Sequence, residues 1–253
     1  MGLTDREKYQ DKIKRLAGLV RSSGKVYALT GAGCSTESGL PDFRSPGTGL
    51  WEKVDPLKYS TSEVLYNDPE SFYKFGFPRF KDLTAAQPNA GHFAMAELEQ
   101  LGFIKGLITQ NIDGLHFKAG SKRIWEVHGH LRTSSCTGCG ARRSFQLLID
   151  KLDSGEVPPR CSCRSVLRPD IVLFGDSMSS SYFEAERALQ AGCDLLLAAG
   201  TSLTVYPVAG LPRFAKQLAI INLQPTPYDR EAAILINQKF SAAMVDLVRE
   251  LKR

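Results

Sequence analysis

Residues 25–44 read KVYALTGAGCSTESGLPDFR, an apolar run followed directly by a polar segment that contains glycines. The run at 26–29 is short and continuous, as a parallel strand buried on both faces would be. Similar runs recur at 103–108, 123–127, 170–174, 194–199 and 218–223. Helical apolar spacing covers 5–22, 90–101 and 183–191. This alternation of strands and helices predicts an α/β fold with a doubly wound, Rossmann-like parallel sheet.

Two stretches interrupt this alternation. Residues 45–88 are broken by glycines and prolines, and residues 131–168 hold four of the six cysteines. We therefore expect residues 1–44, 89–130 and 169–253 to form the Rossmann-like domain. The two insertions should together form a smaller lobe.

The composition is that of a globular chain without a membrane anchor. The 253 residues are 43% hydrophobic and 23% charged, and no apolar run reaches the roughly 18 residues of a membrane-spanning helix. The start, MGLTDREKYQ, lacks the apolar core of a signal peptide. A net charge of +5 is spread over scattered lysines and arginines, which favours a solvated surface over a nucleic-acid groove. We expect a soluble, cytoplasmic protein that binds neither membranes nor nucleic acid directly.

Polar segments, most of them containing glycine, follow the predicted strands. They are Gly31-Ala32-Gly33, Gln110-Asn111-Ile112-Asp113, His128-Gly129, Gly175-Asp176, Gly200-Thr201-Ser202 and Asn222. Because the carboxyl ends of parallel strands meet at one edge of a doubly wound sheet, these groups should line a single crevice. Such folds bind their ligands there.

The Gly31-Ala32-Gly33 segment is only part of a dinucleotide-binding fingerprint. Its glycines let backbone N–H groups approach a phosphate, and a helix beginning after them would add its positive end. Thr36 stands where the fingerprint G-x-G-x-x-G has its third glycine. From this pattern alone, a phosphate-binding loop and a structural turn are about equally good interpretations of the segment. The missing third glycine argues against an ordinary hydride-transferring dehydrogenase.

Five blocks resemble the sirtuin signature, in the order of that family, between about residues 10 and 250. They are GAGCSTESGLPDFR at 31–44, TQNIDGLH at 109–116, the pair His128-Gly129, RPDIVLFGD at 168–176 and GTSLTVYP at 200–207. The resemblance implies an NAD-dependent protein deacetylase, with NAD as co-substrate in the Rossmann-like domain. It also implies a helical insert with the cofactor loop at 45–88 and a zinc-binding insert at 131–168.

The resemblance assigns roles to residues of these blocks. His128 would be the general base that deprotonates a ribose hydroxyl, which a neutral imidazole near pH 7 suits, and Asn111 would bind ribose or order a water. Asp113 and Ile112 would hold the nicotinamide carboxamide, which needs a fixed acceptor and a fixed donor. Phe43 would cover the reacting ribose face. The other expected cofactor contacts are Gly31, Ala32, Gly33, Ser35, Thr36, Arg44, Gln110, Gly200, Thr201, Ser202, Asn222, Leu223 and Gln224.

Two further segments resemble those between which sirtuins bind the backbone of an acetylated peptide. They are Val172, Phe174 and Gly175 on one side and Leu203, Thr204 and Val205 on the other. Recognition by an added strand reads mostly main chain. Acetylated proteins of varied sequence are therefore the expected partners, with a chromatin or DNA-binding protein among the candidates.

The clustered cysteines have the spacing of a metal site. Cys136-x-x-Cys139 and Cys161-x-Cys163 are separated by 21 residues, close to the spacing of a four-thiolate zinc site. The second pair departs from the C-x-x-C of sirtuins, but a C-x-C pair can still chelate. We expect one structural zinc ion, and no catalytic role for these thiols, because protein ligands would fill the tetrahedron.

Sirtuins that favour acidic acyl groups resemble one another in a Tyr-x-x-Arg pair that binds the distal carboxylate. Three positions after Tyr59, Tyr66 and Tyr73 stand Ser62, Pro69 and Gly76. The sequence therefore predicts removal of acetyl and longer uncharged acyl groups in preference to succinyl. A mono-ADP-ribosyltransferase and a non-catalytic NAD-sensing module are the alternatives. The presence of every candidate catalytic residue weighs against the module.

Overall fold

The computed structural model describes residues 4–42 and 58–253, and its main feature is a six-stranded sheet. The strand order is β3 (Ile124–Glu126), β2 (Ile104–Thr109), β1 (Val26–Thr30), β7 (Cys193–Ala199), β8 (Ala215–Ile221) and β9 (Ile234–Ile236). Every neighbouring pair is parallel. The chain progresses outward from β1 in both directions, so the predicted doubly wound sheet is confirmed.

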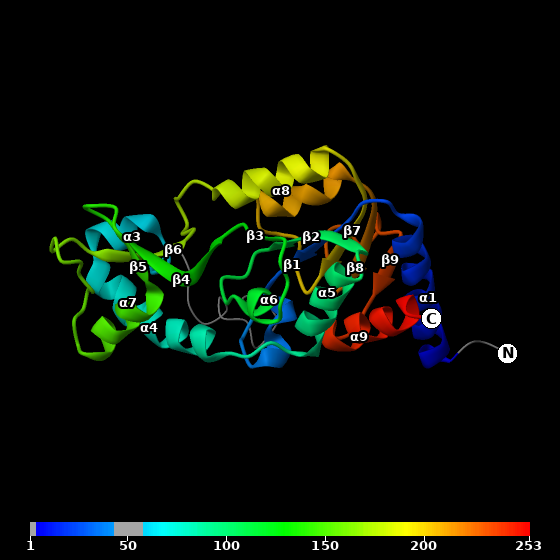
Figure 1. The fold of residues 1–253 in the computed structure, drawn as a ribbon, viewed down its shortest axis with the longest axis horizontal. Helices are drawn as coiled ribbons and strands as arrows, with labels where there is room; N and C mark the ends of the chain where they lie inside the picture. Colours follow the sequence, from blue (N-terminus) through cyan, green and yellow to red (C-terminus); the bar gives the residue numbers. More distant parts are fainter. Residues whose placement is uncertain (1–3, 43–57) are drawn as a thin grey trace.

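Helices cover both faces of this sheet (Figure 1). One face carries α1 (Asp5–Ser22), α5 (Ala90–Gln100) and α9 (Phe240–Leu251), and the other carries α8 (Ser180–Gln190) and the 3₁₀ helix η4 (Val208–Phe214). Within β1, Val26 and Ala28 belong to the core of the first face, whereas Tyr27 and Leu29 belong to that of the second. Burial on both faces explains why this strand is a continuous apolar run.

A second, three-stranded antiparallel sheet corrects one sequence prediction. Its order is β5 (Arg142–Ser144), β4 (Gly129–Cys136) and β6 (Leu167–Ile171). We expected a strand of the large sheet at 170–174, and this was wrong, because β6 pairs with β4 instead. The sixth strand of the large sheet is β9, which the sequence analysis missed. Residues 168 and 169, predicted to lie on either side of a domain boundary, are both in β6.

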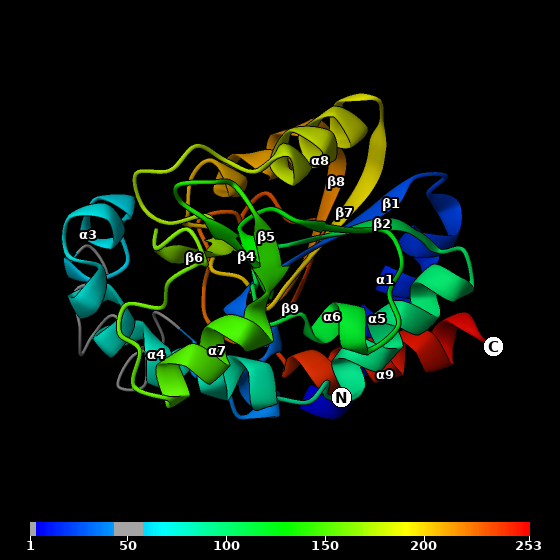
Figure 2. The ribbon, with the colours of Figure 1, turned by 60° about the vertical axis from the view of Figure 1, so that its left-hand side comes forward.

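The small sheet packs with helices into a separate hydrophobic core. These helices are α3 (Ser62–Asn67), α4 (Pro69–Ala85) and α7 (Phe145–Asp153), which lie beside β4, β5 and β6 in both ribbon views (Figures 1 and 2). Phe72 and Phe80 of α4, Phe145 of α7 and Leu167 of β6 are buried in this core. The ring of Phe80 meets that of Phe145 edge to face at 5.6 Å, an arrangement that aromatic pairs prefer.

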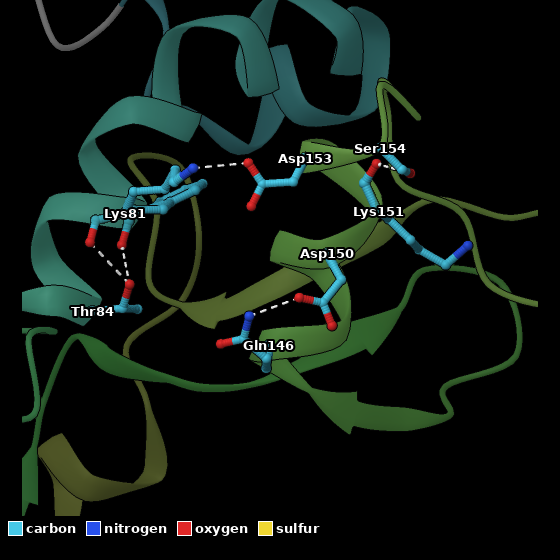
Figure 3. A network of polar contacts seen from close by, with 8 residues as sticks. Lys81, Thr84, Gln146, Asp150, Lys151, Asp153 and Ser154 are labelled. Atoms are coloured by element: carbon cyan, nitrogen blue, oxygen red, sulfur yellow. Dashed lines mark hydrogen bonds and ion pairs between the residues drawn. The ribbon is translucent and has the colours of Figure 1, made fainter.

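Polar contacts join α4 to α7 at the surface (Figure 3). The Nζ of Lys81 lies 2.8 Å from Asp153 Oδ1, and within α7 Gln146 donates to Asp150 at 2.7 Å. Both side chains of the ion pair are about half exposed, so it contributes little to stability, and the aromatic core holds the two helices together.

The segment after β1 differs from the expected helix start. The described residues up to 42 form only two short 3₁₀ turns there, η1 (Ala32–Cys34) and η2 (Thr36–Ser38). The predicted α-helix directly behind Gly33 is therefore wrong, since no α-helix begins within 32–42 whose dipole could support a phosphate. Among the described helices, none is both long and apolar enough to cross a membrane.

Candidate functional site

A cavity of about 460 Å³ lies where the carboxyl ends of β1, β2 and β3 meet the small lobe. The large sheet contributes Ala32, Ser35, Gln110, Asn111, Ile112, Asp113 and His128 to its wall. The segments at 171–176 and 205–207 and the helix α4 contribute most of the remaining described lining, which also includes Leu40, Pro41, Tyr59, Ser60 and Met178. The structure therefore brings together most residues that the sequence analysis placed in one crevice.

A buried hydrogen-bond network fixes the loop after β2 against the loop after β1. The Nδ2 of Asn111 donates to Gly31 O at 3.1 Å and approaches Ser35 Oγ at 3.2 Å. Ser35 Oγ in turn donates to Asp113 Oδ2 at 2.7 Å, and Leu115 N–H donates to the other carboxylate oxygen at 2.9 Å. The side chains of Asn111 and Asp113 are thus held in one orientation at the cavity wall.

Burial has a clear effect on the Asp113 carboxyl. Desolvation raises its pKa above the ordinary value, while the hydrogen bonds from Leu115 N–H and Ser35 oppose that rise. A carboxyl with both oxygens engaged is a fixed acceptor, which suits recognition of an amide N–H group on a ligand.

His128 lies between β3 and β4, and its ring lines the cavity. Its Nδ1 is 2.9 Å from the carbonyl oxygen of Gln110. Because a carbonyl can only accept, Nδ1 carries the proton and Nε2 has the free lone pair. Burial lowers the pKa of His128, and the bond to Gln110 opposes that shift. The imidazole is therefore neutral near pH 7 and can accept a proton through Nε2.

Two glycine turns touch each other beside the cavity. Gly33 N–H donates to Gly200 O at 2.9 Å, and a Cβ on Gly33 would lie 2.8 Å from that oxygen. Gly200 has φ +59°, and a Cβ there would lie 2.4 Å from the backbone nitrogen of Cys34. Close backbone approach between the loops therefore explains both glycines, independently of any phosphate.

Gln110 and Thr201 connect the same loops through side chains. The Nε2 of Gln110 donates to Thr201 Oγ1 at 2.9 Å, so the carboxyl ends of β2 and β7 are joined directly. Ser202 Oγ lies 2.8 Å from Thr204 Oγ1. These hydroxyls close the turn after β7 beside Gly31, whose added Cβ would lie 2.9 Å from Thr201 Cβ.

The segment expected to bind peptide is paired with a neighbouring strand-like segment. Phe174 N–H donates to Ser60 O at 3.2 Å, and Ser62 N–H donates to Phe174 O at 2.9 Å. Val172, Phe174 and Gly175 line the cavity, as does Val205 from the facing segment. Leu203 is different, because its side chain is buried in the core under α8 and only its main chain is left to meet a peptide.

Other expected cofactor residues lie away from the described cavity wall. Thr36 is exposed and donates to Gly33 O at 3.0 Å. Asn222 donates to Gln224 O at 2.8 Å in the turn after β8, where the Leu223 side chain is exposed. Phe43 and Arg44 fall outside the described residues.

Sequence reasoning missed the contribution of α4 to the cavity. Six residues of this helix line the cavity: Phe72, Phe75, Gly76, Arg79, Phe80 and Leu83. Their spacing of three and four residues marks one face of a helix, and this periodicity was the available signal. The glycines and prolines of 45–88 obscured it, although Asp68 caps α4 by accepting from Ser71 N–H and Pro69 occupies a favourable first position.

The clustered cysteines form a group with metal-binding geometry. Ligand sulfurs of Cys136, Cys139, Cys161 and Cys163 all lie within 4.8 Å of one another. The Sγ atoms of Cys136 and Cys163 are 3.3 Å apart, and those of Cys139 and Cys161 are 3.9 Å apart. Tetrahedral zinc with bonds of about 2.3 Å places its sulfurs about 3.8 Å apart, so the four residues fit a zinc ion.

The shortened C-x-C loop adapts through its backbone. Arg164, directly after the pair, has φ +71°, and its N–H donates to Cys161 O at 2.8 Å. Hydrogen bonds from Ser165 N–H, and from the Cys136 thiol, lower the pKa of Cys163 to about 6, and Cys163 N–H lowers the pKa of Cys161. Hydrogen bonds to the other thiols raise the pKa of Cys139 to about 11, so the protons of the cluster are shared among its sulfurs until a metal displaces them.

Comparison with known proteins agrees with the geometry. The Sir2 family model matches residues 31–207. An NAD-dependent protein deacetylase 2 from Caldanaerobacter subterraneus subsp. tengcongensis is 49% identical over 95% of this chain and 96% of its own. A structure described as the basis for the mechanism and regulation of Sir2 enzymes superposes with a TM-score of 0.88 at 36% identity, covering 96% of this chain and 99% of that one.

A second solved structure adds reaction products. It is a Sir2 protein with a deacetylated p53 peptide and 3′-O-acetyl-ADP-ribose, at TM-score 0.89 and 35% identity, covering 94% of this chain and 98% of that one. The family model covers more than half of the chain, and the relative and both structures cover 94% or more of it. The chain therefore belongs to the Sir2, or sirtuin, family.

Proposed function

We propose that this protein is an NAD-dependent protein deacetylase, which transfers the acetyl group of an acetyl-lysine to ADP-ribose and releases nicotinamide. The observation that carries this proposal is the cavity in which neutral His128, Asn111 and Asp113 meet. A relative with 49% identity is an NAD-dependent protein deacetylase, and a Sir2 structure holds a deacetylated peptide with acetyl-ADP-ribose.

His128 acts as the general base. Its Nε2 has the free lone pair, because Nδ1–H is committed to Gln110 O. The acetyl oxygen bonds to the ribose carbon as the bond from that carbon to nicotinamide breaks. His128 then takes the proton from a neighbouring ribose hydroxyl, whose oxygen attacks the acetyl carbon. General-base assistance of this kind contributes about 10² to 10⁴ in rate.

Asp113 and Ile112 hold the nicotinamide end of NAD. The carboxylate of Asp113 accepts from the amide of the ligand, and the backbone of Ile112 completes the recognition. Asn111, fixed by Gly31 O and Ser35, positions ribose or a water. Because these side chains are already held in place, the bond between nicotinamide and ribose can lie close to the acetyl oxygen without a further loss of side-chain entropy. The glycine turns, Gln110, Thr201, Ser202 and the segment 222–224 serve the remaining parts of NAD.

The acetylated peptide pairs with main chain. It enters between Val172, Phe174 and Gly175 on one side and the segment 203–205 on the other, as an added strand. This mode tolerates many sequences, and a chromatin or DNA-binding protein is a candidate substrate. The proposed location of the protein itself is the cytoplasm.

We further assign the small lobe, formed by 45–88 and 131–168, to support of this site. One zinc ion held by the four cysteines would stabilise the three-stranded sheet, whose strand β4 begins directly after His128. The domain that holds NAD is the one built on the six-stranded sheet, for which the sequence predicts residues 1–44, 89–130 and 169–253; residues 169–171 are an exception, because they lie in β6 of the three-stranded sheet.

One assay tests the proposed function. The protein is incubated with NAD and an acetylated peptide, and nicotinamide, peptide mass and label on protein are followed together. Deacetylated peptide with acetyl-ADP-ribose in equal amounts is the expected result. Transfer of ADP-ribose to protein without deacetylation would show a mono-ADP-ribosyltransferase, and no turnover would show a non-catalytic module.

A further inference from the structure

The chain crosses from the large sheet to the small sheet at His128. Strand β3 ends at Glu126, and β4 begins at Gly129 (Figure 1). Arg132 of β4 reaches back across this crossing and forms a bidentate ion pair with Glu126. Its Nη1 donates to Glu126 Oε1 at 2.6 Å, and its Nη2 donates to Oε2. One ion pair therefore joins the strand before the proposed base to the strand after it.

The same guanidinium packs on the segment that follows Asp113. Its Cζ lies 4.9 Å from the centre of the Phe117 ring in α6 (Leu115–Lys118), within the range of a cation–π contact. The residue before the arginine, Leu131, donates its N–H to Ile112 O at 3.3 Å. The start of β4 therefore holds the loop proposed to recognise nicotinamide, through one side chain and one backbone hydrogen bond.

Glu126 requires a positively charged partner because its carboxylate is mostly buried and acts on Asp113. Its side chain is only 12% exposed. Burial has the largest effect in raising the pKa of Asp113, and the charge of Glu126 raises that pKa further. Removing one partner from a mostly buried ion pair leaves an uncompensated charge. Without Arg132, the full field of the Glu126 carboxylate would therefore act on Asp113.

We propose that Arg132 is a positioning residue for nicotinamide recognition, which neutralises Glu126 and holds the loop that carries Asp113. Neither Arg132 nor Glu126 lines the described cavity, so the pair acts through Asp113 and not on the ligand. The inference rests on the proposed function, in which the Asp113 carboxylate accepts a hydrogen bond from the nicotinamide amide. A carboxylate that stays charged and fixed in orientation remains a good acceptor.

Two dinucleotides measure this recognition directly. One is NAD, and the other is 3-acetylpyridine adenine dinucleotide, in which a methyl group replaces the amino group of the amide. Asp113 can accept a hydrogen bond from the first and not from the second. The ratio of their kcat/KM values with the same acetylated peptide reports this hydrogen bond, and the fraction of folded enzyme cancels in it. In Arg132→Met the ratio should fall about 10-fold, because a hydrogen bond to a charged group is weakened.

Further variants separate positioning from a general defect. Arg132→Lys keeps a positive charge beside Glu126 and should lower the ratio less than Arg132→Met does. The double variant Glu126→Gln with Arg132→Met removes both charges, so no uncompensated carboxylate is left. Its ratio should therefore exceed that of Arg132→Met alone. Arg132→Gln is measured beside Arg132→Met, so that a folding defect in one variant leaves the ratio measurable in the other.

Lys151→Met is the matched control. Lys151 of α7 forms an ion pair with Glu156 at 2.8 Å, also in the small lobe, and neither residue lines the cavity. Breaking this pair removes one cation from the same lobe without touching the proposed link to Asp113. The ratio of the two dinucleotides should stay at its wild-type value.

The outcomes are distinguishable. An unchanged ratio in Arg132→Met and Arg132→Gln would overturn the inference and leave the proposed function standing. An equal fall in Lys151→Met would also overturn it, because the effect would then belong to the small lobe in general. A double variant no better than Arg132→Met would overturn the neutralisation of Glu126. Failure of the wild-type protein to turn over the acetylated peptide with NAD would instead overturn the proposed function.

Discussion

The four histidines of the chain differ in their surroundings more than in their sequence context. His92 and His116 are buried against each other, with ring centres 4.7 Å apart, and burial lowers the pKa of each. His128 lines the cavity and has one nitrogen committed to a backbone carbonyl. His128 is suited to proton transfer because its ring faces the ligand cavity and its tautomer is fixed.

Replacement of His128 by alanine should lower kcat about 10² to 10⁴-fold and leave NAD binding within a few-fold of wild type, because the loss affects proton transfer. Titration with NAD and steady-state assays measure the two effects. Activity above about a tenth of wild type would remove His128 from the role of base.

The pH dependence follows from the same residue. Burial places the pKa of His128 below its ordinary value, so the neutral form that acts as base persists into mildly acidic solution. The rate should therefore be half-maximal below pH 6.5, the ordinary pKa of histidine, and should fall with the slope of one proton on the acidic side. A half-maximal rate at or above pH 6.5 would contradict this prediction.

Gly33 should tolerate no side chain. In Gly33→Ala the new Cβ would lie 2.8 Å from Gly200 O, a backbone atom that cannot move aside, so we expect a loss of about 1–3 kcal/mol in the free energy of unfolding and weaker NAD binding. Gly18→Ala in α1 is the control, because its Cβ meets nothing within 4 Å and should stabilise by about 0.5–1 kcal/mol. Equal stability of the two variants would refute the role of close packing.

At the scale of elements, the start of α5 depends on a histidine. Asn89 caps this helix, and Asn89 N–H donates to His92 Nδ1 at 3.2 Å, which completes a capping box. The Nε2 of His92 and the Nδ1 of His116 are buried without partners among the described residues. The first turn of α5 therefore contains a buried imidazole, His92, which is neutral in the folded protein because burial disfavours its charged form.

This arrangement predicts a loss of stability in acid. Burial lowers the pKa of His92 to about 4 in the folded protein, against 6.5 for a free side chain. The unfolded chain binds the extra proton, so the free energy of unfolding falls as the pH falls below 6.5, by about 2 kcal/mol at pH 5.

The variant His92→Gln separates this contribution from other acid effects. Glutamine at this position can still return a hydrogen bond to the cap and does not titrate. Urea unfolding at pH 7.5 and pH 5.0 should show a smaller acid loss in the variant than in wild type. The same loss in both proteins would place the acid sensitivity elsewhere.

At the scale of the whole molecule, the six-stranded sheet has a hydrophobic core on each face, and a third core lies among α4, α7 and the three-stranded sheet. The cysteine group belongs to the small lobe: Cys136 ends β4, Cys161 and Cys163 precede β6, and Cys136 and Cys161 are part of the third core. Loss of zinc should therefore act first on the small lobe and on catalysis indirectly.

Cys136→Ala or treatment with a strong chelator should lower the stability of the small lobe and reduce activity, because thiolate ligation contributes folding free energy. Metal analysis, protease sensitivity of 131–168 and deacetylation are the measurements. Cys193→Ala, in β7 of the large sheet, is the control and should retain zinc. A protein without zinc and with full activity would refute the structural role.

The sequence by itself determined the features that depend on local pattern. Apolar periodicity predicted the helix at 5–22 and the strand beginning at Val26, and the structure has α1 at Asp5–Ser22 and β1 at Val26–Thr30. Residues of the loops after β1, β2 and β3 could be grouped, because parallel strands end at a common edge. The cysteine spacing likewise identified four sulfurs that meet in space.

Only the tertiary structure decided which partners short segments have. The apolar residues at 170–174 could not show that β6 (Leu167–Ile171) pairs with β4 rather than with the large sheet, and the three residues of β9 carry too little pattern to be recognised. That Arg79 of α4 lines the cavity was likewise decided by the tertiary structure. Periodicity gives a residue its face on a helix, but what that face meets depends on contacts between residues far apart in the chain.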